Sequence, residues 1–308
     1  MKLLLPALLA VLLATGCHRE PAADAGPRPD LHEQNAVFSY ALQELQDRGE
    51  FAGAVTLVVA PRGAIALEAF GLADIESQRP MRRDSVFWIA SMTKPITAMG
   101  VLMLVEEGKL GLDDPVSKFV PAFRAQTLTT KSGPAQPRRA VTVRDLLTHT
   151  SGLRDYFGLF GMAGYPSDYP ITNGAFLEMM RRQRTLNFPT GTQYSYSNSG
   201  YVLLSIIVER ASGQSLRDFS AERFFTPLGM RSTQFRDQHN QLVPNRALAY
   251  GRNARGEYVH AVPYFDVVGD GGLYSTVEDI ARWEANFLEP KVGGVEWLRL
   301  EQMRGRLN

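Results

Sequence analysis

Ser91 and Lys94 have the spacing of a nucleophile and its base. They stand three positions apart in Ser91-Met92-Thr93-Lys94, where a helix is expected to begin. Positions i and i+3 of a helix lie on one face, so the hydroxyl and the amine would be neighbours. A serine hydroxyl needs a base to take its proton, and a lysine amine can serve when burial or nearby cations lower its pKa. The pair predicts nucleophilic catalysis. Chance gives about one such pair in a chain this long, so a helix-capping serine beside a solvated lysine is the alternative.

Tyr196-Ser197-Asn198 is the second candidate for chemistry. It lies in the stretch YSYSNSGY, shortly after Pro189-Thr190-Gly191. A tyrosine oxygen near an ammonium ionises more easily and can pass a proton, and an asparagine amide can hold a substrate amide. Taken alone, the stretch is better explained as a polar loop that caps a helix beginning near Ser199.

The pattern of apolar residues predicts the elements that position these groups. A helix should run from near Ser91 to about Glu107, because Pro95 lacks an N–H and must lie in the first helical turn. Two β-rich runs, 53–60 and 64–71, predict a hairpin that follows a helix over 33–48. Further helices are expected at 142–148, 175–183, 199–212, 215–225 and 276–288, and residues 110–174 should be mostly loops.

Together, the two motifs resemble those of the serine β-lactamase and penicillin-binding superfamily, which uses Ser-x-x-Lys and a second motif of Ser or Tyr followed two residues later by Asn. The tyrosine form is similar to class C β-lactamases, D-alanyl-D-alanine carboxypeptidases and esterases of the same fold. The resemblance covers roughly residues 33–290. Further matches, in the family's order, are Leu112-Asp113-Asp114-Pro115-Val116, His149-Thr150-Ser151-Gly152-Leu153 and Gly271-Gly272-Leu273-Tyr274-Ser275-Thr276, the last followed by Asp279, Ala281 and Trp283.

This resemblance implies an α+β fold in which an antiparallel sheet is flanked by helices and joined to an all-helical region. It also implies that Ser91 is the acylated nucleophile and that its backbone N–H is one oxyanion donor. Lys94 and Tyr196 would be the proton-transfer pair, and Asn198 would bind the amide side of the acyl group. No cofactor and no metal are implied. His149 is interpreted as positioning a loop and not as the base of a triad.

The expected function is therefore hydrolysis of an amide or ester through an acyl-enzyme, on a D-amino-acid peptide, a β-lactam or a small ester. The alternative is an inactive penicillin-binding-like module that binds cell-wall peptide or a protein partner. The family's third motif, a Lys or His followed closely by Gly, is not found before Asn308, and Lys291-Val292-Gly293-Gly294 is interpreted as a turn. We therefore expect an incomplete sheet that lacks its C-terminal strands, a truncated form of a longer protein, and doubtful activity of this form.

The N-terminal segment resembles a bacterial lipoprotein signal. Residues 1–16 hold one charge and an apolar run, and Cys17, the only cysteine, follows directly. The expectation is a lipid on Cys17 and a flexible tether over 17–31, so that the protein is exported and anchored to a bacterial membrane. An ordinary secretory signal is the alternative. The remainder, 32–308, should form one domain with a sheet part (32–108 and about 271–308) and a helix-rich part (about 109–270).

Composition excludes several other functions. The chain is 44% hydrophobic and 21% charged, which is typical of a globular protein. It carries 33 basic and 32 acidic residues with no basic stripe, so nucleic acid is not an expected partner. It contains no G-x-S-x-G elbow, no H-E-x-x-H pair and no phosphate-binding glycine loop. The expected partner is thus a small-molecule or peptide substrate, and the oligomeric state is not predicted.

Overall fold

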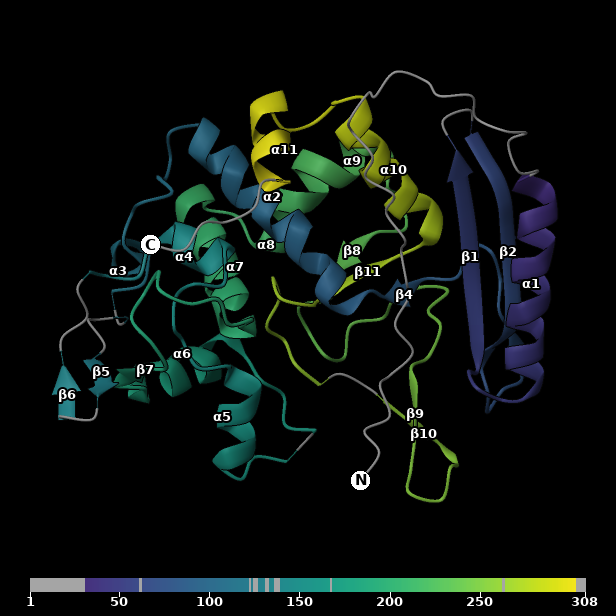
Figure 1. Cartoon of the computed structure of the whole chain (residues 1–308), viewed down its shortest axis with the longest axis horizontal. Helices are drawn as coiled ribbons and strands as arrows, with labels where there is room; N and C mark the ends of the chain where they lie inside the picture. The colour runs from purple at the N-terminus through teal and green to yellow at the C-terminus, as the bar shows by residue number, and fades with distance from the viewer. Residues whose placement is uncertain are drawn as a thin grey trace, which may run out of the picture. The chain divides into compact units, whose positions relative to one another are not determined.

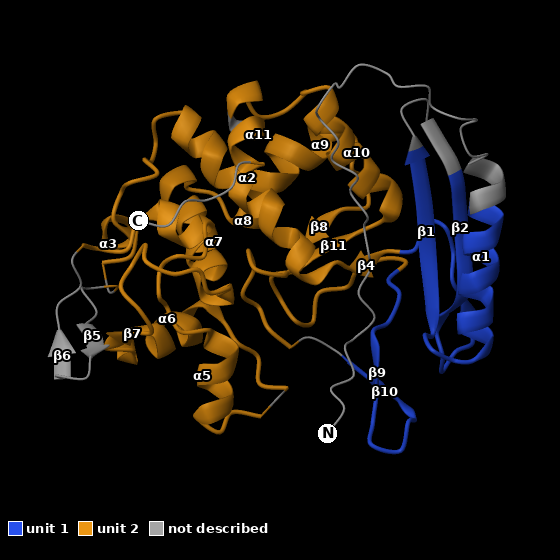
Figure 2. Ribbon diagram, in the orientation of Figure 1, with its two compact units in different colours: residues 1–85, 246–261 blue, residues 86–245, 262–308 orange. Residues whose placement is uncertain are grey.

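Helices and small, mainly antiparallel sheets make up the structure, which confirms the α+β class (Figure 1). The computed structural model describes residues 31–302, except 61–62, 122, 124–126, 131–132, 136–138, 167 and 262–263. The expected signal, Cys17 and almost all of the tether therefore lie outside the described residues. Contacts divide the chain into two compact units, residues 1–85 with 246–261 and residues 86–245 with 262–308 (Figure 2).

The first unit is built on the predicted hairpin. Strand β1 (Gly53–Ala60) pairs antiparallel with β2 (Gly63–Asp74), with Leu57 opposite Leu67, and the register shifts at Val58/Val59. A two-residue strand, β3 (Arg79–Pro80), adds to the other side of β2. Helix α1 (Leu31–Asp47) packs on β2. The expected helix and hairpin are both confirmed.

A small ribbon completes this unit. Strand β9 (Tyr250–Arg252) pairs antiparallel with β10 (Tyr258–His260). It is fixed to the hairpin by the Leu248 N–H, which donates to the Ala73 carbonyl at 2.8 Å, and by the Tyr250 hydroxyl, which donates to Asp74 at 3.2 Å. This ribbon was not predicted from the sequence.

Two helices form the centre of the second unit. Helix α2 (Thr93–Glu106) follows a 3₁₀ turn over Ala90–Met92, and α7 (Asn198–Ser212) packs directly against it. Both helices are apolar around most of their circumference, as expected for helices enclosed by others. Members with at most 3% exposure include Ile96, Met99, Leu102, Leu104, Val202, Leu203, Leu204 and Ile207.

Shorter helices surround this pair. They are α3 (Val116–Phe119), α4 (Val143–Leu147), α5 (Tyr156–Met162), α6 (Asn173–Arg182), α8 (Leu216–Ser220), α9 (Thr226–Leu228), α10 (Val277–Leu288) and α11 (Val295–Glu301). The helix expected at 215–225 is α8 followed by a π-helical turn, Ala221–Phe225, that leads into α9. Turns and loops predominate among the described residues of 110–174, as expected, but α3 and α5 were not predicted there. In α5 the Asp155 carboxylate caps the helix by accepting from the Phe157 N–H.

Two small sheets belong to the same unit. One has the order β4-β11-β8, formed by Phe87–Trp88, Leu273–Ser275 and Gln234–Phe235. The other has the order β6-β5-β7, formed by Gly133–Ala135, Thr127–Thr130 and Thr185–Leu186, with β5 and β7 parallel. The Lys291–Gly294 string connects α10 and α11 without regular structure, as expected for a turn.

Within the described residues, no helix is both long and apolar enough to span a bilayer. The two compact units are delimited by contacts, whereas the expected sheet part and helix-rich part are delimited by secondary structure. The contact-based division does not test the expected one, which stays a prediction.

Candidate active site

Ser91 lies in a tight turn between a strand and a helix. The chain leaves β4, turns at Ala90, which has a φ of 47°, and enters α2 through the 3₁₀ turn. A positive φ is costly for a residue with a Cβ and recurs where surrounding structure holds a functional group in place. Here the Thr93 hydroxyl donates to the Ala90 carbonyl at 2.6 Å and accepts from the Leu273 N–H at 3.2 Å. The turn leaves Ser91 exposed directly before α2, and the helix start expected near Ser91 is confirmed.

Lys94 lies one helical turn beyond Ser91 and is 5% exposed. Its Nζ donates to Ser91 Oγ at 3.1 Å, to Asn198 Oδ1 at 2.9 Å and to the Asp270 carbonyl at 2.6 Å. An ammonium has three donors, so each is satisfied. The amine also lies over the ring of Tyr196, 4.7 Å from its centroid. These contacts hold Lys94 in one position and exclude a solvated lysine.

Tyr196 reaches the same serine from a distant part of the sequence. Its hydroxyl donates to Ser91 Oγ at 2.7 Å, and the side chain is 44% exposed. A serine oxygen has two lone pairs, so it can accept from Lys94 and Tyr196 together. The structure therefore brings two predicted side chains, Lys94 and Tyr196, to the oxygen of the third, Ser91.

His149 holds the segment around Tyr196 in place. Its ring lies 4.7 Å from that of Tyr196, its carbonyl accepts from the Ser195 N–H at 3.0 Å, and its Nδ1 accepts from the Ser197 N–H at 3.2 Å. Burial first, and the Lys94 ammonium second, lower the pKa of His149 to about 4. The imidazole is thus neutral at pH 7, with its proton assigned to Nε2 by this hydrogen-bond pattern. These contacts support the interpretation of His149 as a positioning residue.

Asn198 joins the cluster through its oxygen. Because Oδ1 accepts from Lys94, the NH₂ end is the part of the amide left for a substrate. Its backbone N–H donates to Asp155 Oδ2 at 2.7 Å. The expected contact between Asn198 and a substrate stays a prediction. Because Oδ1 is engaged by Lys94, that contact would be made by the side-chain NH₂ group of Asn198.

Two buried residues behind Lys94 were missed from the sequence. Asp270 is 3% exposed and Tyr156 is fully buried, and the tyrosine hydroxyl donates to Asp270 Oδ2 at 2.9 Å. Burial raises the pKa of Asp270 to about 6, against the opposing effects of Lys94 and the Tyr156 hydrogen bond. The available signal was an acidic residue in the apolar and glycine-rich run Val267-Val268-Gly269-Asp270-Gly271, directly before a motif that we did recognise.

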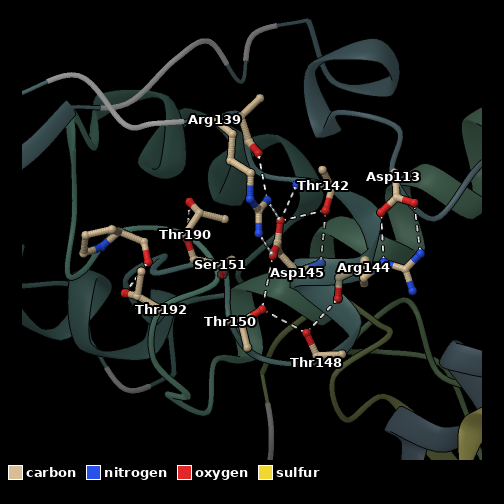
Figure 3. A network of polar contacts seen from close by, with 12 residues as sticks. Asp113, Arg139, Thr142, Arg144, Asp145, Thr148, Thr150, Ser151, Thr190 and Thr192 are labelled. Atoms are coloured by element: carbon tan, nitrogen blue, oxygen red, sulfur yellow. Dashed lines mark hydrogen bonds and ion pairs between the residues drawn. The ribbon is translucent and has the colours of Figure 1, made fainter. Parts of the chain in front are cut away.

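A polar network fixes the loop that carries His149 (Figure 3). At its centre, the Asp145 carboxylate accepts from Arg139 at 2.5 and 2.8 Å, from the Thr142 hydroxyl at 2.7 Å and from the Thr150 hydroxyl at 3.2 Å. Burial alone would raise the pKa of Asp145, but the hydrogen bonds from Arg139 and Thr142 outweigh it and the net pKa is lowered. The carboxylate thus stays charged and joins the start of α4 to the loop that follows this helix.

Glycine is required at the end of the same loop. Gly152 has a φ of 77°, and a Cβ there would lie 2.4 Å from the Phe188 carbonyl oxygen. The close approach allows the Asn187 N–H to donate to the Gly152 carbonyl at 2.8 Å. The motif His149–Leu153 is therefore a compact turn whose shape depends on this residue.

No group of three or more His, Cys, Asp or Glu side chains in the described part of the chain is arranged to hold a metal ion. The side chains that do converge are a hydroxyl, an amine, a phenol and an amide, which together suit proton transfer at a serine oxygen.

Comparison with protein families decides the relationship. A model described as Beta-lactamase matches residues 38–306, a range that contains Ser91, Lys94, Tyr196 and Asn198. This chain belongs to the β-lactamase family. The resemblance inferred from the two motifs is confirmed, and with it the β-lactamase type of α+β fold.

Members of the β-lactamase family that are similar to the chain carry different names. Penicillin-binding protein 4* of Bacillus subtilis (strain 168) is 34% identical over 258 residues, 79% of this chain and 53% of that protein. Esterase EstB of Burkholderia gladioli is 40% identical over 209 residues, 65% of this chain and 50% of the esterase. The solved D-amino acid amidase from Ochrobactrum anthropi SV3, complexed with L-phenylalanine amide, has a TM-score of 0.69 at 26% identity, over 86% of this chain and 73% of the amidase.

The chain spans about half the length of these two curated relatives. The three names cover penicillin binding, ester cleavage and amide cleavage. Membership of the β-lactamase family therefore does not fix the substrate, since one fold hosts several activities.

Proposed function

We propose that this protein is a serine hydrolase that cleaves an amide or ester through an acyl-enzyme on Ser91. The observation that carries the proposal is the pair of hydrogen bonds to Ser91 Oγ, from Lys94 Nζ at 3.1 Å and from Tyr196 Oη at 2.7 Å. Both groups can exchange a proton with the nucleophile without any movement of the chain. Such positioned acid–base groups contribute about 10²–10⁴-fold to a reaction rate.

Two half-reactions follow from this arrangement. In acylation, Ser91 Oγ bonds to the carbonyl carbon while its proton passes to the Lys94–Tyr196 pair. The bond to the leaving alcohol or amine then breaks, and that group takes up the proton. In deacylation, water gives a proton to the same pair and attacks the acyl carbon, and Ser91 recovers a proton as its bond to carbon breaks.

The substrate class follows the family's range: a D-amino-acid peptide, a β-lactam or a small ester. Asn198 supports a substrate that carries an acyl amide, because its NH₂ group is left to donate to a carbonyl oxygen on the substrate. An ester without such an amide would forgo this contact.

Covalent labelling tests the proposal. Purified protein is incubated with a fluorescent penicillin or a fluorophosphonate, and its intact mass is measured. We expect a single adduct that is absent from Ser91→Ala and retained by Ser195→Ala. Ser195 is an exposed serine directly before Tyr196 and serves as the matched control. Absence of an adduct from protein with a cooperative thermal transition would overturn the proposal and favour a non-catalytic binding module.

Export and a lipid on Cys17 form the second part of the proposal. Its support is the sequence alone: a basic start, an apolar run, small residues and then the only cysteine. In a bacterial host we expect the protein in the membrane fraction with incorporated radioactive palmitate, and we expect Cys17→Ser to lose both properties. Palmitate incorporation into Cys17→Ser would refute this assignment.

A further inference from the structure

Asp270 and Tyr156 lie behind Lys94, and the proposed mechanism uses neither side chain. The Asp270 carboxyl is almost fully buried, and its Oδ2 accepts from the Tyr156 hydroxyl at 2.9 Å. The other oxygen, Oδ1, is buried without a hydrogen bond from another described residue. The main-chain oxygen of Asp270 accepts from Lys94 Nζ at 2.6 Å. Asp270 thus contacts the amine through its main-chain dipole, and the buried carboxyl of the same residue experiences the Lys94 charge.

A buried carboxylate is costly unless an opposite charge or hydrogen bonds compensate it. The titratable groups that face Asp270 are Lys94 on α2 and, at the start of α5, Tyr156 and Asp155. Lys94 and Tyr156 favour the carboxylate, whereas burial and the Asp155 charge disfavour it. Because the resulting pKa of Asp270 is about 6, the carboxyl is mostly ionised at pH 7.5 and mostly neutral at pH 5.

The start of α5 anchors two of the three acceptors of Lys94. The Asp155 carboxylate accepts from the Asn198 N–H at 2.7 Å, and Asn198 Oδ1 accepts from Lys94. The next residue, Tyr156, holds the Asp270 side chain, and the Asp270 carbonyl also accepts from Lys94. Adjacent residues of one short helix therefore fix the amine from two sides.

We propose, resting on acyl transfer at Ser91, that Asp270 is a positioning residue: its side chain, fixed by Tyr156, holds the main-chain oxygen that accepts from Lys94, and its charge favours the ammonium form of that amine. The charge on Asp270 then influences the pH at which the site can take up the Ser91 proton. A carboxylate stabilises a neighbouring ammonium, so removing it makes the neutral amine available at lower pH.

The first test is the pH dependence of labelling. The second-order rate constant with a fluorophosphonate is measured from pH 5 to pH 10 for the wild type and for Asp270→Asn, which keeps the shape but removes the charge. For Asp270→Asn we expect the rising limb of the rate–pH profile to move to lower pH by about one unit. This is the lower end of the effect that a nearby opposite charge has on a pKa. Asp266→Asn is the matched control, because Asp266 lies in the same segment but pairs with His239, and its limb should not move.

The second test needs no activity. Protein labelled with ¹³C at aspartate carboxyls is titrated by NMR, with Asp270 assigned through its main-chain resonances. We expect its midpoint near pH 6 in the wild type and at higher pH in Lys94→Met, because coupling between two charges is reciprocal.

The two tests separate the possible failures. An unchanged carboxyl midpoint in Lys94→Met, or an unmoved limb in folded Asp270→Asn, would overturn the role of Asp270. Labelling that persists in Ser91→Ala would instead overturn the proposed function, and the NMR result would still decide whether Asp270 and Lys94 are coupled. If Asp270→Asn does not fold, the NMR titration alone decides.

Discussion

Lys94 and Tyr196 both contact the Ser91 oxygen but differ in their exposure to solvent. Lys94 is 5% exposed and has all its donors engaged, whereas Tyr196 is 44% exposed. A buried amine cannot exchange protons quickly with bulk water, but an exposed phenol can. We therefore expect Tyr196 to be the route by which a proton leaves and enters the site.

Tyr196→Phe tests this division of roles. The variant keeps the ring that covers Lys94 and stacks on His149 but loses the hydroxyl at 2.7 Å from Ser91 Oγ. We expect the rate of labelling by a fluorophosphonate to fall about a hundredfold or more, the range for one acid–base group. Tyr194→Phe is the control, since Tyr194 also contacts the His149 ring but is 63% exposed, and it should label at close to the wild-type rate. Equal rates for Tyr196→Phe and Tyr194→Phe would contradict the assignment.

Local spacing explains which site residues could be predicted. Ser91 and Lys94 are three residues apart on a helix, so their contact follows from helix geometry. Tyr196 is 105 residues from Ser91, and only the family resemblance connected them. Asp270 is 176 residues from Lys94 and contacts it through a main-chain oxygen, which any residue carries. No side-chain pattern could therefore have indicated that contact.

At the scale of elements, the loop after α4 depends on one buried ion pair. The Asp145 side chain is 4% exposed and is paired with Arg139, whose side chain is 37% exposed. The carboxylate joins the start of α4, through Thr142, to Thr150 in the loop that carries His149. The neighbouring pair of Arg144 and Asp113 has 48% and 78% exposure and so experiences a solvent-like dielectric (Figure 3).

Asp145→Asn should destabilise the protein far more than Asp113→Asn. Removing one partner of a buried pair costs about 3–5 kcal/mol, and we expect about 3 kcal/mol because Arg139 keeps access to solvent. Breaking an exposed pair costs about 0–1 kcal/mol. Urea denaturation measures both free energies of unfolding. Equal losses in the two variants would show that the buried network does not hold the loop.

Two of the helices predicted from the sequence begin with recognisable capping residues. Thr142 and Asp145 form a full capping box, and the Thr276 hydroxyl accepts from the Asp279 N–H at 3.2 Å, so both helix starts were found. Helix α5 was missed because Tyr156–Met162 contains two glycines, which disfavour a helix. Burial of Tyr156 and Phe160 overrides that preference, and such burial is not visible in local sequence.

At the scale of the whole molecule, we expect stability to depend on pH through Glu301, a residue of α11 whose carboxyl oxygens are buried. Burial first, and the charge of Glu284 on α10 second, raise the pKa of Glu301 to about 8. Neither carboxyl oxygen of Glu301 has a hydrogen-bond partner within the described residues. Helix α11 packs on α2, the helix that carries Lys94.

Glu301→Gln should therefore stabilise the protein at alkaline pH and not at acid pH. Between pH 4.5, the ordinary value, and pH 8 the folded state binds more protons at Glu301 than the unfolded state does, so stability falls as pH rises through this window. Each unit is worth about 1.4 kcal/mol, which gives a loss on the order of a few kcal/mol by pH 8.5. Thermal melts of Glu301→Gln and of Glu296→Gln, an exposed control on the same helix, should coincide near pH 4.5 and separate by pH 8.5. Parallel melting curves across this range would mean that Glu301 is solvated, and that α11 packs on α2 without the cost of a buried charge.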